Sequence, residues 1–204
     1  HEIRNPMQVT RGFLQLLDEH DLPDEKKEYI QISLEELDRA DEIINDFLYF
    51  GKPSMNNNER IDVGYQLKRV VNIIQSYTHN RDVEIKTDLI DNCWIYANPQ
   101  KLNQSVINIL KNAIESMPTG GIVWITCTST DDGYIKITIK DQGIGMTKKQ
   151  IDMLGSPYYS LKENGTGLGM MVSFQIINSF KGKIKVNSEK AIGTEFIILL
   201  PQIT

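Results

Sequence analysis

The chain has 204 residues, 40% of them hydrophobic and 24% charged, with a formal net charge of −5. This composition is that of ordinary globular proteins and argues against intrinsic disorder, and the length allows one or two domains whose core needs no disulfides. No run approaches the roughly 20 apolar residues of a membrane-spanning helix, and no signal peptide is visible.

The charge is unevenly distributed along the chain. Residues 1–53 hold 6 Lys and Arg against 13 Asp and Glu, a balance of −7, whereas the remainder holds 16 against 14. Proteins that bind nucleic acid present a basic face, so the acidic first part argues against such a partner. A solvated helix surface explains the acidic excess better than a docking patch does.

The cysteines and histidines indicate no metal centre. Cys93 and Cys127 lack metal-ligand spacing, and we expect reduced thiols of a cytosolic protein. His1, His20 and His79 are far apart in the sequence. Because the chain begins with His in what the pattern predicts is mid-helix, it is interpreted as a fragment. We expect a cytoplasmic portion without membrane contact, which a missing upstream region could anchor in the cell membrane.

The first fifty residues have helical periodicity. Apolar residues recur at spacings of four and three along a coiled-coil-like seam formed by Ile3, Met7, Thr10, Leu14 and Leu17. After a break at residues 20–23 the pattern restarts, and its apolar positions are Ile30, Leu34, Leu37, Ile44 and Leu48.

These two series predict a helical hairpin. Pro23 followed by Asp24 and Glu25 suits a helix start, because acidic side chains favour the positive N-terminal end. Two helices alone bury such wide apolar stripes poorly, so a dimer forming a four-helix bundle is expected. Packing against the second half of the same chain is the alternative.

A linker rich in Gly, Pro and Asn lies at residues 51–58 and places the domain boundary near Pro53. The predicted domains are therefore 1–53 and 54–204. In the second, helices are predicted at 63–77, 99–117 and 168–180, and strands at 83–88, 94–97, 122–128, 134–140, 183–187 and 195–200. Three helices beside a mostly antiparallel sheet define an α+β sandwich.

Three polar patterns in this second domain point to a nucleotide. Asn108 and Asn112 lie one helical turn apart, where amide oxygens suit Mg²⁺ beside phosphate oxygens. Asp141 ends a strand, where its carboxylate can accept the exocyclic amine of adenine. It is followed by Gly143 and Gly145, which permit close backbone approach. Each pattern alone is weak, since paired Asn and Asp-x-Gly-x-Gly turns are common.

A glycine-rich helix start supplies the third pattern. Gly165 to Gly169 opens a helix, and backbone N–H groups there bind phosphate well. Residues 155–164 have the length and the flanking glycines of a lid over a bound nucleotide. Within it Lys162 could reach a terminal phosphate, and Tyr158 and Tyr159 could pack the lid down.

The order of these motifs resembles the ATP-binding domain shared by histidine kinases, gyrase-type topoisomerases, Hsp90-type chaperones and MutL-type repair proteins. Residues 108–115 resemble its N box, 141–145 its G1 box, 157–160 its F box with Tyr where Phe is usual, and 165–169 its G2 box. Gly193 to Phe196 matches a last short motif near the adenine. The resemblance implies that ATP is held by Asn108, Asn112, Asp141, Gly143, Gly145, Tyr158, Gly165, Thr166, Gly167, Leu168, Gly169 and Thr194, with Mg²⁺ on Asn108 and Asn112.

The chain start resembles the H box of histidine kinases, with the pattern His-Glu-x-x-Asn-Pro at residues 1–6. An imidazole nitrogen is a nucleophile at neutral pH, and Glu2 can hydrogen-bond the other ring nitrogen of His1. Asn5 lies one turn further, where the resemblance implies that it orients a water for dephosphorylation. His1, Glu2, Asn5 and Lys162 are thus the expected catalytic residues.

Residues 46–53 narrow the resemblance to the sporulation kinases of spore-forming Gram-positive bacteria, the sporulation kinase B type in particular. It implies a two-component sensor histidine kinase that phosphorylates His1 and passes the phosphoryl group to an aspartate of a response regulator in a sporulation phosphorelay. It also implies a homodimer through the hairpin, and a hairpin surface that a protein inhibitor could bind.

Three rival interpretations share the ATP-binding domain. A silent scaffold predicts damaged boxes, whereas Asn112, Asp141, Gly143, Gly165 and Gly167 are all present. A chaperone-type or topoisomerase-type ATPase, which uses ATP to close a clamp, would leave the His-Glu-x-x-Asn-Pro hairpin without a role. A serine kinase of the anti-sigma type lacks a preceding histidine hairpin.

Overall fold

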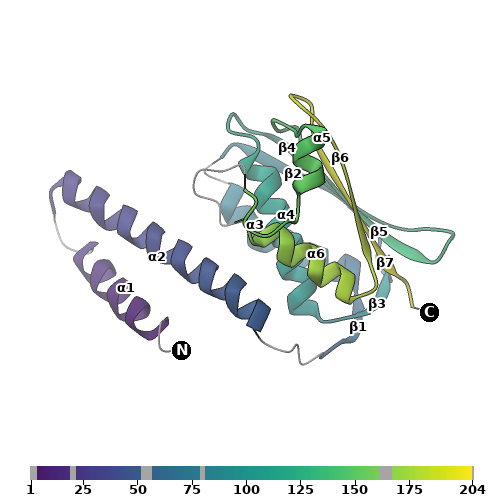
Figure 1. The fold of residues 1–204 in the computed structure, drawn as a ribbon, viewed down its shortest axis with the longest axis horizontal. Coiled ribbons are helices and arrows are strands. Elements are labelled where there is room, and N and C mark those ends of the chain that lie inside the picture. The colour runs from purple at the N-terminus through teal and green to yellow at the C-terminus, as the bar shows by residue number, and fades with distance from the viewer. Residues whose placement is uncertain (1–3, 19–21, 52–56, 79–80, 161–166, 204) are drawn as a thin grey trace. The chain divides into compact units, whose positions relative to one another are not determined.

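The computed structural model describes residues 4–18, 22–51, 57–78, 81–160 and 167–203 (Figure 1). The chain divides into two compact units, His1–Pro53 and Ser54–Thr204. Among the described residues, no helix combines the length and the apolar character that a bilayer crossing requires.

The first unit is the predicted helical hairpin. Helix α1 spans Arg4–Asp18 and helix α2 spans Asp24–Gly51, and the two pack side by side (Figure 1). The carbonyl of Pro23 accepts hydrogen bonds from the backbone N–H of Lys26 and Lys27 at 2.8 and 3.2 Å, which begins the first turn of α2. Asp24 and Glu25 occupy that turn, where the helix dipole favours acidic side chains.

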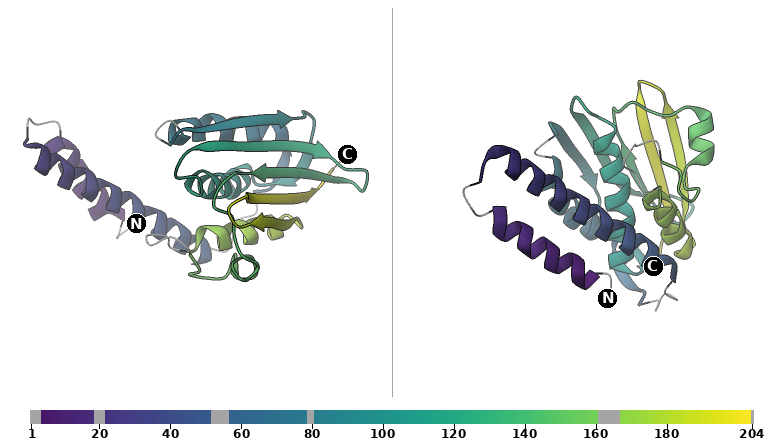
Figure 2. Two further views of the ribbon diagram at one scale, coloured as in Figure 1. Left: turned by 90° about the horizontal axis from the view of Figure 1, so that it is seen from above. Right: turned by 60° about the vertical axis from the view of Figure 1, so that its left-hand side comes forward.

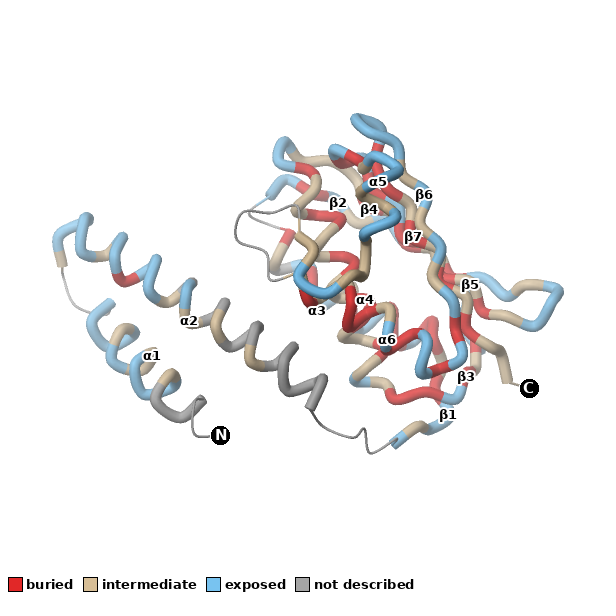
Figure 3. The backbone as a smooth tube through the Cα atoms, viewed as in Figure 1, coloured by how far each residue is buried: buried red, intermediate tan, exposed pale blue. Residues whose placement is uncertain are grey.

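Among the hairpin residues whose burial is described, few are enclosed. Ile30 is buried, and the helix–helix seam is otherwise half-buried at positions such as Met7, Leu14 and Leu34 (Figure 3). A second set of large apolar side chains is exposed, namely Val9, Phe13, Leu16 and Leu17 of α1 and Tyr29 and Ile32 of α2. The hairpin therefore carries an apolar surface that its own two helices do not cover.

The second unit is the predicted α+β sandwich. Its five-stranded sheet has the order β2-β4-β5-β7-β6, in which only the β2–β4 pair is parallel, and β1 and β3 form a separate antiparallel pair. Helices α3, α4 and α6 cover one face of the sheet (Figures 1 and 2). In chain order the elements are β1 (Glu59–Asp62), α3 (Val63–Thr78), β2 (Val83–Leu89), β3 (Trp94–Ala97), α4 (Pro99–Glu115), β4 (Gly121–Ser129), β5 (Tyr134–Lys140), α5 (Lys148–Met153), α6 (Gly169–Ser179), β6 (Lys183–Glu189) and β7 (Gly193–Pro201).

The core of this unit lies between the sheet and the helices. Alternate strand residues face inward, so that Cys127, Ile137 and Ile198 form one fully buried cross-strand row. Ile109 and Ile176 of the helices are also fully buried. Burying large apolar side chains contributes about 1.5–3 kcal/mol each, so this face is the main source of stability of the unit.

Both cysteines are buried free thiols. Burial raises the pKa of Cys93 and of Cys127. The thiolate is the reactive form of cysteine, so these two side chains are chemically inert core residues.

Two short elements were not predicted from the sequence. Strand β1 has four residues, too few to show alternation, and forms because it pairs with β3, where the Arg60 guanidinium lies 4.6 Å from the Trp94 ring centroid. Helix α5 has a capping box: Thr147 Oγ1 accepts from Gln150 N at 3.4 Å, and Gln150 Oε1 accepts from Thr147 N at 2.7 Å. That signature was visible in the sequence as Thr-x-x-Gln.

Candidate nucleotide site

The centre of the candidate site is Asp141, which directly follows β5 and is 3% exposed. Its Oδ1 accepts hydrogen bonds from the backbone N–H of Gly143 at 2.8 Å and of Thr194 at 3.0 Å. Its own N–H donates to the carbonyl of Thr194 at 2.9 Å. The acid is thus fixed by the end of β5 and the start of β7.

The electrostatics of Asp141 follow from this burial. Desolvation raises the pKa of its carboxyl group, and the opposing hydrogen bonds from Gly143, Thr194 and the Ser116 side chain only partly offset it. Both of these backbone bonds end on Oδ1, so Oδ2 is the oxygen that a ligand amine would meet. A buried carboxylate with one oxygen held in place is suited to select a hydrogen-bond donor.

Glycines let the loop after Asp141 approach its neighbours. A Cβ on Gly143 would lie 1.9 Å from Ser116 Oγ, and the N–H of Ile144 donates to the carbonyl of Ser116 at 3.0 Å. Gly145 has φ +61°, and a Cβ there would lie 1.9 Å from the carbonyl oxygen of Glu189. The loop is therefore held between the end of α4 and the β6–β7 turn.

The asparagines of α4 are tied to the start of α6. Asn108 Nδ2 donates to the carbonyl of Gly169 at 3.2 Å, which joins the two predicted motifs. The polar atom of Asn108 that this bond does not use is Oδ1, the atom suited to a hard cation. Asn112 is half-buried one turn further along α4.

The residues that lead into α6 pack on the first part of the predicted lid. Gly167 has φ +69°, and a Cβ there would lie 2.4 Å from the carbonyl carbon of Tyr158 and 2.6 Å from the nitrogen of Tyr159. Tyr158 has φ +60° and is 74% exposed. Leu168 is buried beside Gly169. Only glycine allows this contact between the F-box and G2-box backbones.

Several predicted site residues lie outside the described residues: His1, Glu2, Lys162, Gly165 and Thr166. Asn5 is part of α1, but its side chain is not described either. The structure joins Asp141, Gly143 and Thr194 in one group and Asn108 and Gly169 in another. Gly145 approaches Glu189, and Gly167 approaches Tyr158 and Tyr159.

Two residues near the site were missed by sequence reasoning. Ser116 follows the N box directly and its hydrogen bonds could have been suspected from that position. Ser188 in β6 carries no local signal, because strand pairing brings it to Thr194. Its Oγ accepts from the N–H of Met146 at 2.8 Å and lies 2.8 Å from Thr194 Oγ1.

Two family models match the chain. The histidine kinase-, DNA gyrase B- and HSP90-like ATPase model matches residues 97–204, and the His Kinase A (phospho-acceptor) domain model matches residues 1–55. The chain therefore belongs to this ATPase family. With the phospho-acceptor domain in front of it, the chain is of the histidine kinase class, and ATP binding is a property of that family.

Two relatives from Bacillus subtilis (strain 168) make the class more specific. Sporulation kinase E is 42% identical over 202 residues, which are 98% of this chain and 27% of that protein. Sporulation kinase B is 40% identical over 204 residues, which are 98% of this chain and 47% of that protein. The predicted resemblance to sporulation kinases is confirmed, and the E and B types match about equally. The chain spans from about a quarter to about half of these relatives.

Solved structures of other kinases share the fold. Full-length ShkA in complex with AMPPNP matches with a TM-score of 0.79 at 24% identity, over 100% of this chain and 44% of that one. The Acinetobacter baumannii histidine kinase AdeS matches with a TM-score of 0.69 at 23% identity, over 100% of this chain and 98% of that one. The predicted fold, a helical hairpin followed by an α+β sandwich, is confirmed.

Proposed function

We propose that the chain is the catalytic core of a sensor histidine kinase in which ATP phosphorylates His1. The observation that carries the proposal is the buried Asp141, held by Gly143 and Thr194, in a chain whose residues 1–55 match the phospho-acceptor domain. Two sporulation kinases match this chain over 98% of its length, which supports the proposal.

The nucleotide is held by both polar side chains and backbone. Asp141 Oδ2 accepts the exocyclic amine of adenine, and Thr194 lies beside it. Asn112 and Asn108 supply amide oxygens for Mg²⁺, which neutralises phosphate charge when bound. The phosphates are held by the backbone of Gly165, Thr166, Gly167, Leu168 and Gly169 and by Lys162, with Gly143, Gly145 and Tyr158 shaping the walls.

His1 is the nucleophile of the phosphoryl transfer. An imidazole nitrogen of His1 attacks the γ-phosphorus, the bond from phosphorus to the bridging oxygen breaks, and ADP leaves. Glu2 hydrogen-bonds the other ring nitrogen and supports the positive charge that develops on the ring. In a separate hydrolytic reaction, Asn5 orients a water that removes the phosphoryl group from the response regulator.

The phosphorylated His1 then donates its phosphoryl group to an aspartate of a response regulator, in a sporulation phosphorelay. This step is supported by the sporulation kinases among the relatives. We place this portion of the protein in the cytoplasm, where such regulators act. The longer protein would be anchored in the cell membrane by a region outside this chain, and fractionation of cells would test that placement.

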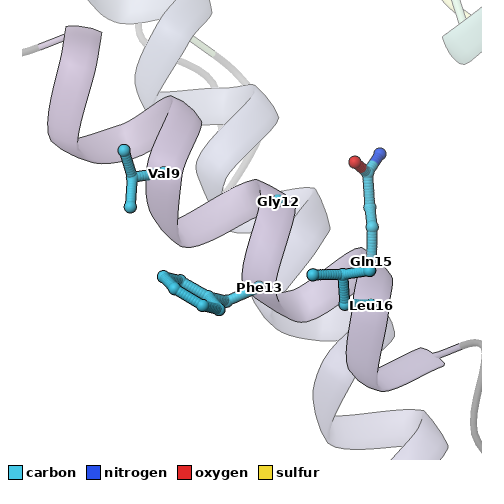
Figure 4. Close-up of a pocket in the computed structure, with 5 residues that line it drawn as sticks. All are labelled: Val9, Gly12, Phe13, Gln15 and Leu16. Atoms are coloured by element: carbon cyan, nitrogen blue, oxygen red, sulfur yellow. The ribbon is translucent and has the colours of Figure 1, made fainter.

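A homodimer would cover the apolar surface of the hairpin. Val9, Phe13 and Leu16 project from one side of α1 and line an open pocket with Gly12 and Gln15 (Figure 4). These apolar side chains are more than half exposed. Contact with the same surface of a second copy would bury both, as in a four-helix bundle. The remaining hairpin surface is available to a regulator or to a protein inhibitor.

Incubation of the chain with γ-labelled ATP tests the proposal. We expect an acid-labile label that His1→Gln abolishes and that the matched control His20→Gln retains. Full incorporation by His1→Gln would contradict the assignment of the acceptor and favour a serine kinase, whereas ATP hydrolysis without any incorporation would favour a clamp-type ATPase. Profiling of the labelled kinase against candidate regulators would then identify the one that takes the label fastest.

A further inference from the structure

Asn98 lies where the linker that leads to the hairpin meets helix α4. It directly precedes α4 and is 9% exposed. Asn57, at the end of the linker, stands two positions before the first residue of β1. Because Glu59 of β1 pairs with Ala97 of β3, the end of the linker and the start of α4 lie side by side. A contact between them joins the connection to the hairpin with the helix that carries the N-box asparagines.

The two polar atoms of the Asn98 side chain make different hydrogen bonds. Oδ1 accepts from the backbone N–H of Lys101 at 3.0 Å, which caps the first turn of α4. Nδ2 donates to the carbonyl of Asn57 at 3.3 Å. Asn57 belongs to the linker predicted at residues 51–58 and to the second compact unit. One side chain therefore ties the linker to α4 within that unit.

Helix capping accounts for only one of these two bonds. Asp caps helices about as well as Asn, and its charge also interacts favourably with the helix dipole. An ionised carboxylate, however, accepts hydrogen bonds and donates none. At position 98 its second oxygen would face the carbonyl oxygen of Asn57, and the two acceptors would repel each other. The amide N–H of Asn98 is thus needed for the bond to the linker and not for the cap.

The linker is the covalent connection between the nucleotide site and the proposed phosphate acceptor. ATP is held by the second unit and His1 belongs to the hairpin, so the rate of transfer depends on how the two are presented to each other. Small errors in the placement of reacting groups cost large factors in rate, even when the change that causes them lies far from the chemistry. A bond that holds the end of the linker therefore bears on phosphoryl transfer without any contact to the nucleotide.

We propose that Asn98 is a positioning residue for phosphoryl transfer, which anchors the linker to the start of α4. By donating to the carbonyl of Asn57, it sets the direction in which the chain leaves the ATP-binding unit toward the hairpin. The inference rests on the proposed function, in which His1 is the acceptor. A purely structural role of Asn98, as a cap of α4, would instead act on stability and on ATP binding.

Asn98→Asp in the full 204-residue chain separates the two roles, because it keeps the capping oxygen and removes the donor. We expect the rate of His1 phosphorylation at saturating ATP to fall about fivefold, the effect of one hydrogen bond. The thermal midpoint and the ATP affinity should not fall. Asn98→Ala, which loses the cap as well, should show the same fall in rate together with a lower midpoint. The matched control Asn72→Asp adds the same charge at an exposed position of α3 and should change neither rate nor affinity.

A spin label on Asn57→Cys measures the anchor without any phosphoryl transfer. Position 57 is exposed, whereas Cys93 and Cys127 are buried, so the label reacts with the new thiol. The substitution leaves the backbone carbonyl that Asn98 contacts in place. We expect the mobility of the label to increase when Asn98→Asp is added, and to stay the same when Asn72→Asp is added instead.

An unchanged spin-label mobility overturns the inference, and so does an unchanged or increased rate in Asn98→Asp. A fall in rate that is matched by a loss of ATP affinity also overturns it, and all three results leave the proposed function intact. If Asn98→Asp does not fold, Asn98→Ser keeps a capping oxygen without an amide N–H for Asn57 and should show the same fall in rate. Failure of the unmodified chain to phosphorylate His1 overturns the proposed function itself, and with it the role of Asn98 in transfer.

Discussion

The two units of this chain bury their apolar residues very differently. In the ATP-binding unit, alternating strand residues and one face each of α3, α4 and α6 meet in a closed core (Figure 3). Among the hairpin residues whose burial is described, Ile30 alone is buried, while Phe13 and Leu16 are exposed. One unit can thus be stable by itself, and the other would gain stability from a second copy in the proposed dimer. Changes that affect one unit and spare the other test this difference.

The largest expected effect comes from Gly143→Ala in the ATP-binding unit. The new Cβ would meet Ser116 Oγ, Cβ and carbonyl oxygen at 1.9 to 2.7 Å, so α4 and the loop must separate. We expect destabilisation of this unit by about 1–3 kcal/mol, and loss of ATP binding. In Gly133→Ala a Cβ meets no atom within 4 Å, so only the backbone strain of alanine at φ +80° is added and ATP binding should be kept. Thermal unfolding and nucleotide titration check this, and normal ATP affinity in Gly143→Ala would contradict it.

Next in size is Phe13→Lys on the hairpin. Replacing this apolar side chain by a charged one at the proposed dimer contact removes about 1.5–3 kcal/mol of burial free energy in each copy. We therefore expect dimer affinity to fall by at least about a hundredfold. ATP affinity should stay the same. Sedimentation at several concentrations measures the first and nucleotide titration the second. Gln8→Lys adds the same charge at an exposed position of α1 and should leave the dimer intact; an intact Phe13→Lys dimer would refute the proposed contact.

A smaller effect concerns pH and Asp141. Because burial raises the pKa of this carboxyl group, the folded unit holds one more proton than the unfolded chain between the ordinary Asp pKa and the raised one. Its contribution to stability is therefore fully present below that window and is lost as pH rises through it. ATP affinity should instead rise with pH through this window, because the ionised carboxylate accepts the amine of the base better than the protonated carboxyl group does.

Thermal unfolding and ATP titration across this pH window measure both slopes. In Asp141→Asn the amide oxygen can still accept from Gly143 and Thr194, so we expect the fold to persist. Both contributions of this residue to the pH dependence should disappear, and ATP should bind weakly at every pH. A wild-type pH profile of ATP affinity in this variant would argue that another group selects the base.

The smallest expected effect is that of Gly12→Ala in α1. A Cβ there meets no atom within 4 Å, and Ala is favoured over Gly inside a helix by about 1 kcal/mol. The hairpin should become more stable, with no change in the ATP-binding unit. The same substitution at Gly64, where a Cβ would lie 2.2 Å from the carbonyl oxygen of Ile90, should destabilise the ATP-binding unit instead. A thermal midpoint that falls for Gly12→Ala would show that the second copy packs closely on this position.

Local patterns in the sequence were sufficient for most of the fold. The alternation in β5 and the period of α4 predicted those elements, since both signals extend over several residues. Strand β1 was not predicted, because its four residues contain only one apolar position, Ile61. It forms through pairing with β3, which the sequence does not show. The capping box of α5 was a local signal that went unused.

The candidate site was predictable where residues act through a local motif. Asp141, Gly143 and Gly167 were predicted because each belongs to a short motif in which the spacing of glycines and acids can be recognised in the sequence. The bond from Asn108 to Gly169 joins residues 61 positions apart, and Ser188 reaches Thr194 only through strand pairing. Such partners depend on the folded sheet and helices, so they could be found only in three dimensions.

The close approach of Gly167 to the Tyr158–Tyr159 backbone determines which changes in sequence length this part of the chain can accept. The contact between residues 158 and 167 fixes the distance between them, whatever sequence connects them. In general, closing a longer chain segment costs only about 0.6 kcal/mol more for each doubling of its length. Insertions and deletions between residues 160 and 167 should therefore be tolerated at little cost in stability, whereas a side chain at position 167 should not.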